Sequence, residues 1–159
     1  MAVDMFLKLD GIKGESKDSK HAGEIEILGW GWAVNQQTIV GAGGGAGAGK
    51  VQISDLKMSK KVDAASPNLI ASCCGGKHFK TATLTVRKAG GSQQDYLKLN
   101  LEEVFITAVE PEGVSADVPT ESLSLNFGKF KYAYSPQKPD GSLDAAIEAG
   151  WDVKKNEKV

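Results

Sequence analysis

The sequence predicts a mainly β protein, folded as an antiparallel β-barrel with one short helix. Apolar residues recur at every second position along most of the chain, which is the period of a strand with one buried face. Two long segments move that alternation to the other face partway along, as strands do at the corners of a barrel. Only one stretch carries both the start and the stop signals of a helix. The 159 residues, 41% of them hydrophobic, suffice for a sizeable core in one domain spanning residues 1–159.

Simple alternation predicts the strands of the first two thirds of the chain. Residues 5–9 (MFLKL) and 81–87 (TATLTVR) each repeat apolar side chains on one face. Residues 97–102 continue this pattern, and Val104, Phe105 and Ile106 then make both faces of the strand apolar. That part of the strand is therefore expected to be covered on both sides.

Two segments change face. In SLSLNFGKFKYAY (122–134), odd positions are apolar up to Phe127 and even positions from Phe130 onward, which predicts a β-bulge at Gly128. In EIEILGWGWAV (24–34), the large apolar residues stand at odd positions at Ile25 and Ile27, and at even positions from Leu28 to Val34. A second long strand with a switch of face is expected there.

The helix is predicted over SPNLIASCCGG (66–76). Ser66 suits the N-cap, Pro67 suits the first helical position, and Gly75 can adopt the left-handed conformation that ends a helix. Leu69 and Cys73 lie four residues apart, so a narrow apolar stripe is expected to pack the helix on the sheet.

Polar stretches containing glycine or proline are predicted as loops at 11–24, 110–121 and 135–150, the last with room for a helical turn. Trp151 and Val153 then alternate with charged residues, as in a short closing strand. His21 lies within the first of these loops, among polar neighbours, and is expected to be solvated.

Charge and composition exclude several classes of partner. The formal net charge is −1 with no block of one sign, so neither nucleic acid nor an anionic membrane is expected to attract the protein. Asp4, Lys8 and Asp10 interrupt the N-terminal stretch that a secretory signal would need, which predicts synthesis in the cytoplasm without a signal peptide. Residues 27–49 are uncharged, but they are too polar for a membrane span.

Known catalytic and metal-binding patterns are lacking in the sequence. It contains no G-x-S-x-G and no H-E-x-x-H motif. Cys73 and Cys74 are adjacent, which disfavours a disulfide between them, and with His78 they lack the two separated ligand pairs of a zinc site. We therefore expect no catalytic residue, no cofactor and no metal.

The run GAGGGAGAGK (41–50) almost matches a phosphate-binding loop. Gly44, Gly49 and Lys50 have the required spacing, but Val51 stands where the motif needs a hydroxyl. The residues after it alternate as a strand, whereas a phosphate-binding loop precedes a helix. The run is instead predicted to be a long loop between two strands. Its glycine and alanine residues offer little side chain to order, so a partner would have to fix it.

Trp30 and Trp32 share one face of their predicted strand. Indoles so placed can stack on a sugar, but paired aromatic residues on a strand more often belong to a core or a subunit contact. A monomeric barrel that binds a ligand or a carbohydrate through Trp30 and Trp32 therefore remains the alternative to an assembly protein.

Several separated stretches, in order along nearly the whole chain, resemble the Hcp family, the haemolysin-coregulated proteins of bacterial type VI secretion. They are MAVDMFLKLDGIKGESKDSKH, ASPNLIASCCGGKHF, TATLTVRKAGG, TESLSLNFGKFKYAYSPQ and GWDVKKN. The resemblance implies a β-barrel of two packed sheets with a lateral helix and no catalytic activity. It further implies a homo-hexameric ring with a wide pore, and rings that stack into a tube.

The resemblance also implies partners and site residues. A contractile sheath drives the tube, tipped by a VgrG-type spike protein, out of the cell, and effector proteins travel in the pore. The protein would thus be assembled in the bacterial cytoplasm and then secreted without a cleaved signal peptide. Trp30, Gly31 and Trp32 correspond to a strand at the pore or at a subunit contact, and Gly31 replaces a small polar residue that is common there. The ring-stacking loop corresponds to residues 38–50, with Thr38, Gly41, Gly44, Gly45, Gly47, Gly49 and Lys50.

Overall fold

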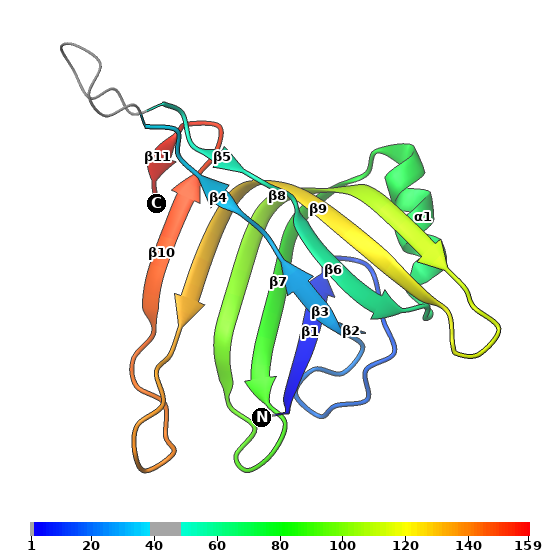
Figure 1. The fold of residues 1–159 in the computed structure, drawn as a ribbon, viewed down its shortest axis with the longest axis horizontal. Helices are drawn as coiled ribbons and strands as arrows, with labels where there is room; N and C mark the ends of the chain where they lie inside the picture. The colour runs from blue at the N-terminus through cyan, green and yellow to red at the C-terminus, as the bar shows by residue number, and fades with distance from the viewer. Residues whose placement is uncertain (1, 39–48) are drawn as a thin grey trace.

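The computed structural model describes residues 2–38 and 49–159, which form eleven strands and one helix (Figure 1). The elements are β1 (Val3–Leu9), β2 (Ile25–Glu26), β3 (Gly29–Gly31), β4 (Val34–Asn35), β5 (Gln52–Ile53), β6 (Leu56–Lys61), α1 (Ser66–Gly75), β7 (His78–Lys88), β8 (Asp95–Glu112), β9 (Thr120–Tyr134), β10 (Ile147–Asp152) and β11 (Glu157–Lys158). All strand pairs are antiparallel. The prediction of a mainly β antiparallel protein with one short helix is confirmed.

The segment 25–31 closes the barrel by pairing with two different strands. β9, β8, β7 and β1 are neighbours in that order, and β6 pairs with the first half of β9. β2 lies against β1, and β3 lies against β6. Between them, the N–H of Ile27 donates to the carbonyl of Met5 at 2.9 Å, and that of Leu28 donates to Ser59 at 2.8 Å. The long strand expected over residues 24–34 is therefore wrong, because the chain breaks there into β2, β3 and β4.

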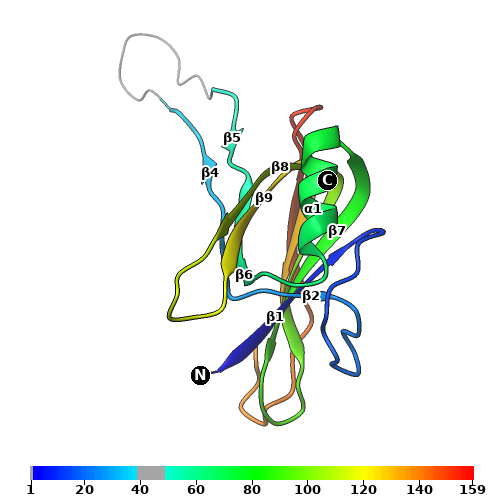
Figure 2. The same ribbon diagram turned by 90° about the vertical axis from the view of Figure 1, so that its right-hand side faces the viewer.

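The inner face of the barrel holds the core. Alternate residues of β1, β6, β7, β8 and β9 point inward and are buried, together with Leu69 of α1. α1 lies on the outside, against β8 (Figure 2). Removing these side chains from water is the main stabilising term of such a fold.

In β8 and β9, the buried side chains move from one face of the strand to the other at the same level of the sheet. Phe127 and Phe130 are both buried on β9, so the predicted switch at Gly128 exists. No residue is inserted at Gly128, because the pairing of β8 with β9 runs through this point without a shift. The expected bulge is wrong in position: the register shift of this pair lies between Ile106 and Ala108 of β8.

The change of face depends on Glu103 and Gly128. Glu103 adopts a left-handed backbone conformation with φ 55°, which turns β8 locally. A Cβ on Gly128 would lie 2.5 Å from Oε2 of Glu103, so glycine leaves room for this side chain to cross β9. From there Glu103 reaches the ammonium group of Lys154 at 2.7 Å.

α1 begins one residue earlier and ends one residue later than the caps predicted from the sequence. The residue at the N-cap is Ala65, and Gly76 has the left-handed conformation with φ 62°. Ser66 does not cap the helix because its hydroxyl donates to Glu121 of β9 at 2.6 Å and accepts the N–H of Asp63 at 3.0 Å. Leu69 is buried as expected.

A buried ion pair holds α1 and β6 on β9. Lys60 occupies an inward position of β6 and lies directly across from Glu121. Both side chains are fully buried and form an ion pair. The Lys60 ammonium also donates to Asp63 at 2.8 Å and to the carbonyl of Lys61 at 2.9 Å. Burial of a charge is unfavourable unless it is paired and hydrogen-bonded, so each partner depends on the other.

We predict that Lys60→Met lowers the free energy of unfolding by about 3–5 kcal/mol, because Glu121 is left buried without its partner. Urea unfolding measures this change. Lys61→Met is the matched control: its side chain is exposed, so the change should stay within about 0.5 kcal/mol. Equal effects of the two substitutions would contradict the assigned role of the pair.

Candidate assembly surfaces

The β4–β5 ladder stands out from the barrel where the chain leaves β3 (Figures 1 and 2). Val34 lies opposite Ile53, and the N–H of Ser54 donates to the carbonyl of Ala33 at 2.9 Å. At the outer end the N–H of Gly49 donates to the carbonyl of Gln37 at 3.1 Å. The ladder thus fixes both ends of the segment that the sequence predicts as a loop.

The predicted ring-stacking residues are placed only at these two ends. Thr38, Gly49 and Lys50 are exposed at the outer end of the ladder. The others, Gly41, Gly44, Gly45 and Gly47, lie outside the described residues.

The two tryptophans are part of the packed structure of the barrel. The Trp32 ring meets Phe130 edge-on at a centroid distance of 4.8 Å and lies 6.1 Å from Phe127. Trp30 lies across from Met58 of β6 and packs against the core. Both indoles are partly buried, and Gly31 between them is exposed. A shared open platform for a sugar is therefore not formed by this pair.

An apolar groove of about 560 Å³ separates the ladder from the β9–β10 part of the sheet. One wall is formed by Val34 and Ile53 of the ladder, and the other by Phe130, Ala149 and Trp151. The groove lies beside the ladder that carries the predicted stacking segment. It is a candidate contact surface and lacks the charged or nucleophilic side chains of an active site.

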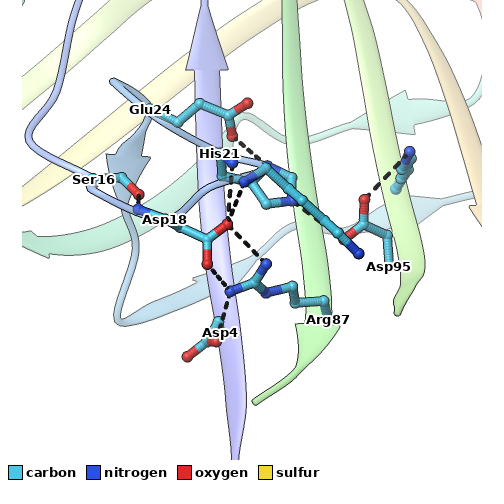
Figure 3. A network of polar contacts seen from close by, with 9 residues as sticks. Asp4, Ser16, Asp18, His21, Glu24, Arg87 and Asp95 are labelled. Atoms are coloured by element: carbon cyan, nitrogen blue, oxygen red, sulfur yellow. Dashed lines mark hydrogen bonds and ion pairs between the residues drawn. The ribbon is translucent and has the colours of Figure 1, made fainter. Parts of the chain in front are cut away.

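A polar network fastens the loop 11–24 across the outer face of β1 and β7 (Figure 3). The buried guanidinium of Arg87 donates to Oδ1 of Asp18 at 2.9 Å and to Asp4 at 3.3 Å, with a second bond to Asp18. It also lies 5.0 Å from the centre of the Phe6 ring. Charge-assisted, two-pronged bonds of this kind are among the strongest in proteins.

His21 belongs to the same network, so the expectation of a solvated histidine is wrong. It is only 7% exposed and stacks on Phe6 at a centroid distance of 4.4 Å. Its ring nitrogens lie 2.9 Å from Glu24 and 3.2 Å from Asp95 of β8. Glu24 is three positions away, but Phe6 and Asp95 come from distant parts of the chain, and no local pattern in the sequence indicates them.

Hydrogen bonds from Arg87 lower the pKa of the Asp18 carboxyl from its ordinary value of 3.8 to about 2. The same pair raises the pKa of Arg87. We call the ion pair of Arg87 and Asp18 the clasp, because it holds the loop 11–24 on the sheet.

The described parts of the chain contain no group of three or more His, Cys, Asp or Glu residues placed to hold a metal ion. Cys73 and Cys74 are free thiols. No helix in the described ranges is long and apolar enough to cross a membrane.

Comparison with known proteins decides the family. The family model described as "Type VI secretion system effector, Hcp" matches residues 6–134. The chain belongs to the Hcp family. It is 45% identical over 159 residues to Protein hcp1 of Pseudomonas aeruginosa, with 98% of each chain covered.

Solved Hcp structures share the fold. A structure described as that of a type six secretion system protein gives a TM-score of 0.94 at 28% identity, covering 99% of this chain and 100% of the other. Hcp1 from Salmonella typhimurium gives 0.80 at 35% identity, with both chains fully covered. A type VI secretion system effector from Yersinia pestis gives 0.78 at 36% identity, covering 94% of this chain and all of the other.

The resemblance seen in the sequence is thereby confirmed. The protein is a type VI secretion Hcp protein, of a family of secreted effectors, and this structural family is non-enzymatic, as predicted. A monomeric barrel that binds sugars through Trp30 and Trp32 finds no support in this family or in the packing of the two indoles.

β10 begins earlier than the sequence predicts. The stretch 135–150 was predicted as a loop, whereas β10 begins at Ile147. Ile147, Ala149 and Trp151 alternate in sequence, and starting the count at Ile147 would have identified the strand.

We predict that the clasp makes stability sensitive to acid. The unfolded chain takes up a proton at Asp18 near the ordinary pKa of 3.8, but the folded chain does so only near 2. The stabilisation is therefore complete above about pH 4 and is lost as the pH falls towards 2.

Urea unfolding between pH 2 and 6 tests this. Asp18→Asn should be less stable than the parent at pH 6 and should lose less stability on acidification. Asp10→Asn, at an exposed carboxylate, is the control and should follow the parent. A parent and an Asp18→Asn variant with parallel profiles would refute the role of this pair.

Proposed function

We propose that this Hcp protein is the subunit of a homo-hexameric ring, and that stacked rings form the inner tube of a type VI secretion system. A contractile sheath drives the tube, tipped by a VgrG-type spike protein, out of the cell, and effector proteins travel in its pore. The chain acts as one domain over residues 1–159. It assembles in the bacterial cytoplasm and leaves the cell with the tube.

One observation carries the proposal. β9 and β10 extend the inner face of the sheet beyond the closed barrel, and there the side chains of Ile147 and Tyr134 are 67% and 45% exposed. An apolar sheet face of this kind requires a cover. A ring of identical subunits provides one, because each copy offers the same surfaces to its neighbour.

We assign stacking to the segment 38–50, the predicted loop with Thr38, Gly49 and Lys50 at its two ends. The β4–β5 ladder, to which both ends of this segment are attached, stands out from the barrel, which favours a contact along the tube axis. Trp30 and Trp32 pack against the core, so Gly31 is the residue through which β3 would meet the pore or a neighbour.

The purified protein should elute in dilute solution near six times the chain mass of 16.8 kDa. Light scattering after size-exclusion chromatography measures this mass, and electron microscopy should show rings seen end-on. A species of one chain mass would contradict the proposal and favour a monomeric binding barrel.

Deletion of residues 42–48 should leave the rings intact and reduce the formation of tubes. The reason is that the ladder could then no longer reach the next ring. A variant in which 42–48 are replaced by serine and glycine at the same length is the matched control, and it should keep its tubes. Tube length and number on electron micrographs measure the effect, and unchanged tubes after the deletion would argue against stacking by this segment.

A further inference from the structure

The β9–β10 sheet carries an apolar stripe that is covered at one end only. On its inner face, residues of β10 lie directly across from aromatic residues of β9, in the pairs Ile147 with Tyr134, Ala149 with Tyr132, and Trp151 with Phe130. Trp32 covers the Phe130 end and meets its ring at 4.8 Å. The Ile147 end has no such cover within the described parts of the chain.

The outer edge of β10 is also open beside this stripe. β11 pairs with Trp151 and Asp152, and the carbonyl of Gly150 accepts the N–H of Val159 at 3.3 Å. From Ile147 to Ala149, no strand within residues 2–38 and 49–159 pairs with this edge. Such an edge can pair with another chain.

Two lysines lie near the Trp151 end of this edge, and one of them, Lys158, is directly across from Trp151. Lys155 and Lys158 lie on either side of Asn156, which lines the apolar groove next to Ala149 and Trp151. Both are exposed, and neither forms an ion pair with a described residue. We call Tyr134, Ile147, Ala149, Lys155 and Lys158 the β10 surface.

A complementary surface lies at the opposite side of the molecule, where β8 turns into β9 (Figure 1). The valines there are exposed, and the N–H of Val62 donates to the carbonyl of Pro119 at 3.0 Å, which brings the end of β6 to this turn. Exposed carboxylates accompany the valines. We call this set the acidic end: Val62, Glu112, Val114, Asp117 and Val118.

We infer that the acidic end of one copy docks on the β10 surface of the next, which makes these two surfaces the halves of one contact between copies of this chain. The inference rests on the proposed ring and names the surfaces that build it. The valines cover the open end of the stripe at Ile147, and the carboxylates meet Lys155 and Lys158. An apolar centre with a charged rim is the usual composition of a protein interface.

The positions of the two surfaces suit a ring. They lie on opposite sides of one molecule, so each copy uses one surface towards each neighbour. A contact between two different surfaces is heterologous, and it forms a closed ring when the rotation between neighbours returns to the start. Opposite charges also select this docking over a self-contact of either surface, where like charges would meet.

Charge exchange tests the pairing of the two surfaces. Glu112→Lys/Asp117→Lys changes only the acidic end, and Lys155→Glu/Lys158→Glu changes only the β10 surface. Each variant places like charges across the contact and should fall from six chain masses to one in light scattering. The chain that carries all four substitutions restores opposite charges and should return to six chain masses.

Ile147→Asp tests the apolar part of the contact, with Ile70→Asp as the matched control. Both side chains are exposed, but Ile70 lies on α1, outside both surfaces. Ile147→Asp should elute at one chain mass and Ile70→Asp at six. Circular dichroism and thermal unfolding like those of the parent verify that each variant is folded.

The outcomes separate the inference from the proposed function. A parent ring that persists in both double variants and in Ile147→Asp overturns the inference and leaves the ring proposal standing. Loss of the ring in both double variants without recovery in the fourfold variant shows that the surfaces do not meet each other, which also overturns it. A parent of one chain mass overturns both.

Discussion

The barrel is shorter than its longest strands, and this mismatch governs which surfaces the molecule leaves open. β9 is shared by two neighbours: β6 pairs with residues 120–125, and β10 pairs with residues 129–134. Only the first half of β9 therefore belongs to the closed wall. The bend at Glu103 and Gly128 lies between the halves, so the second half leaves the barrel together with β10. The core side of that extension remains apolar although the barrel no longer covers it.

Buried polar groups fix the segments that strand pairing does not hold. Lys60 and Glu121 bind the start of α1, where the helix meets β6 and β9. Arg87 and Asp18 bind the loop 11–24 to the outer face of β1 and β7. Paired buried charges are weak evidence for stability, but the removal of one partner is strongly destabilising, so they hold each segment in one arrangement. The barrel therefore holds the uncovered apolar surfaces in fixed positions.

Local patterns predicted the parts of this structure whose causes are local. Alternation identified β1, β7, β8 and β9, and turn residues identified the loop before Thr120. The exact start of α1 was not predictable, because the Ser66 hydroxyl binds Glu121, which is 55 positions away in the sequence.

The same reasoning explains the errors in the candidate site. His21 was assigned to solvent because its burial depends on Phe6 and Asp95, which the chain brings to it only after folding. The bulge was placed at Gly128 because one strand alone cannot reveal that Glu103 of its neighbour takes the strained conformation. The open end of β10 is not indicated by the alternation after Trp151, because the strand begins four residues earlier, at Ile147. The proposed lateral and axial contacts thus depend on different kinds of residue. The proposed lateral surfaces consist of apolar side chains that the barrel leaves uncovered, whereas the proposed axial contact depends mainly on the backbone of the β4–β5 ladder, so a change in one contact need not disturb the other.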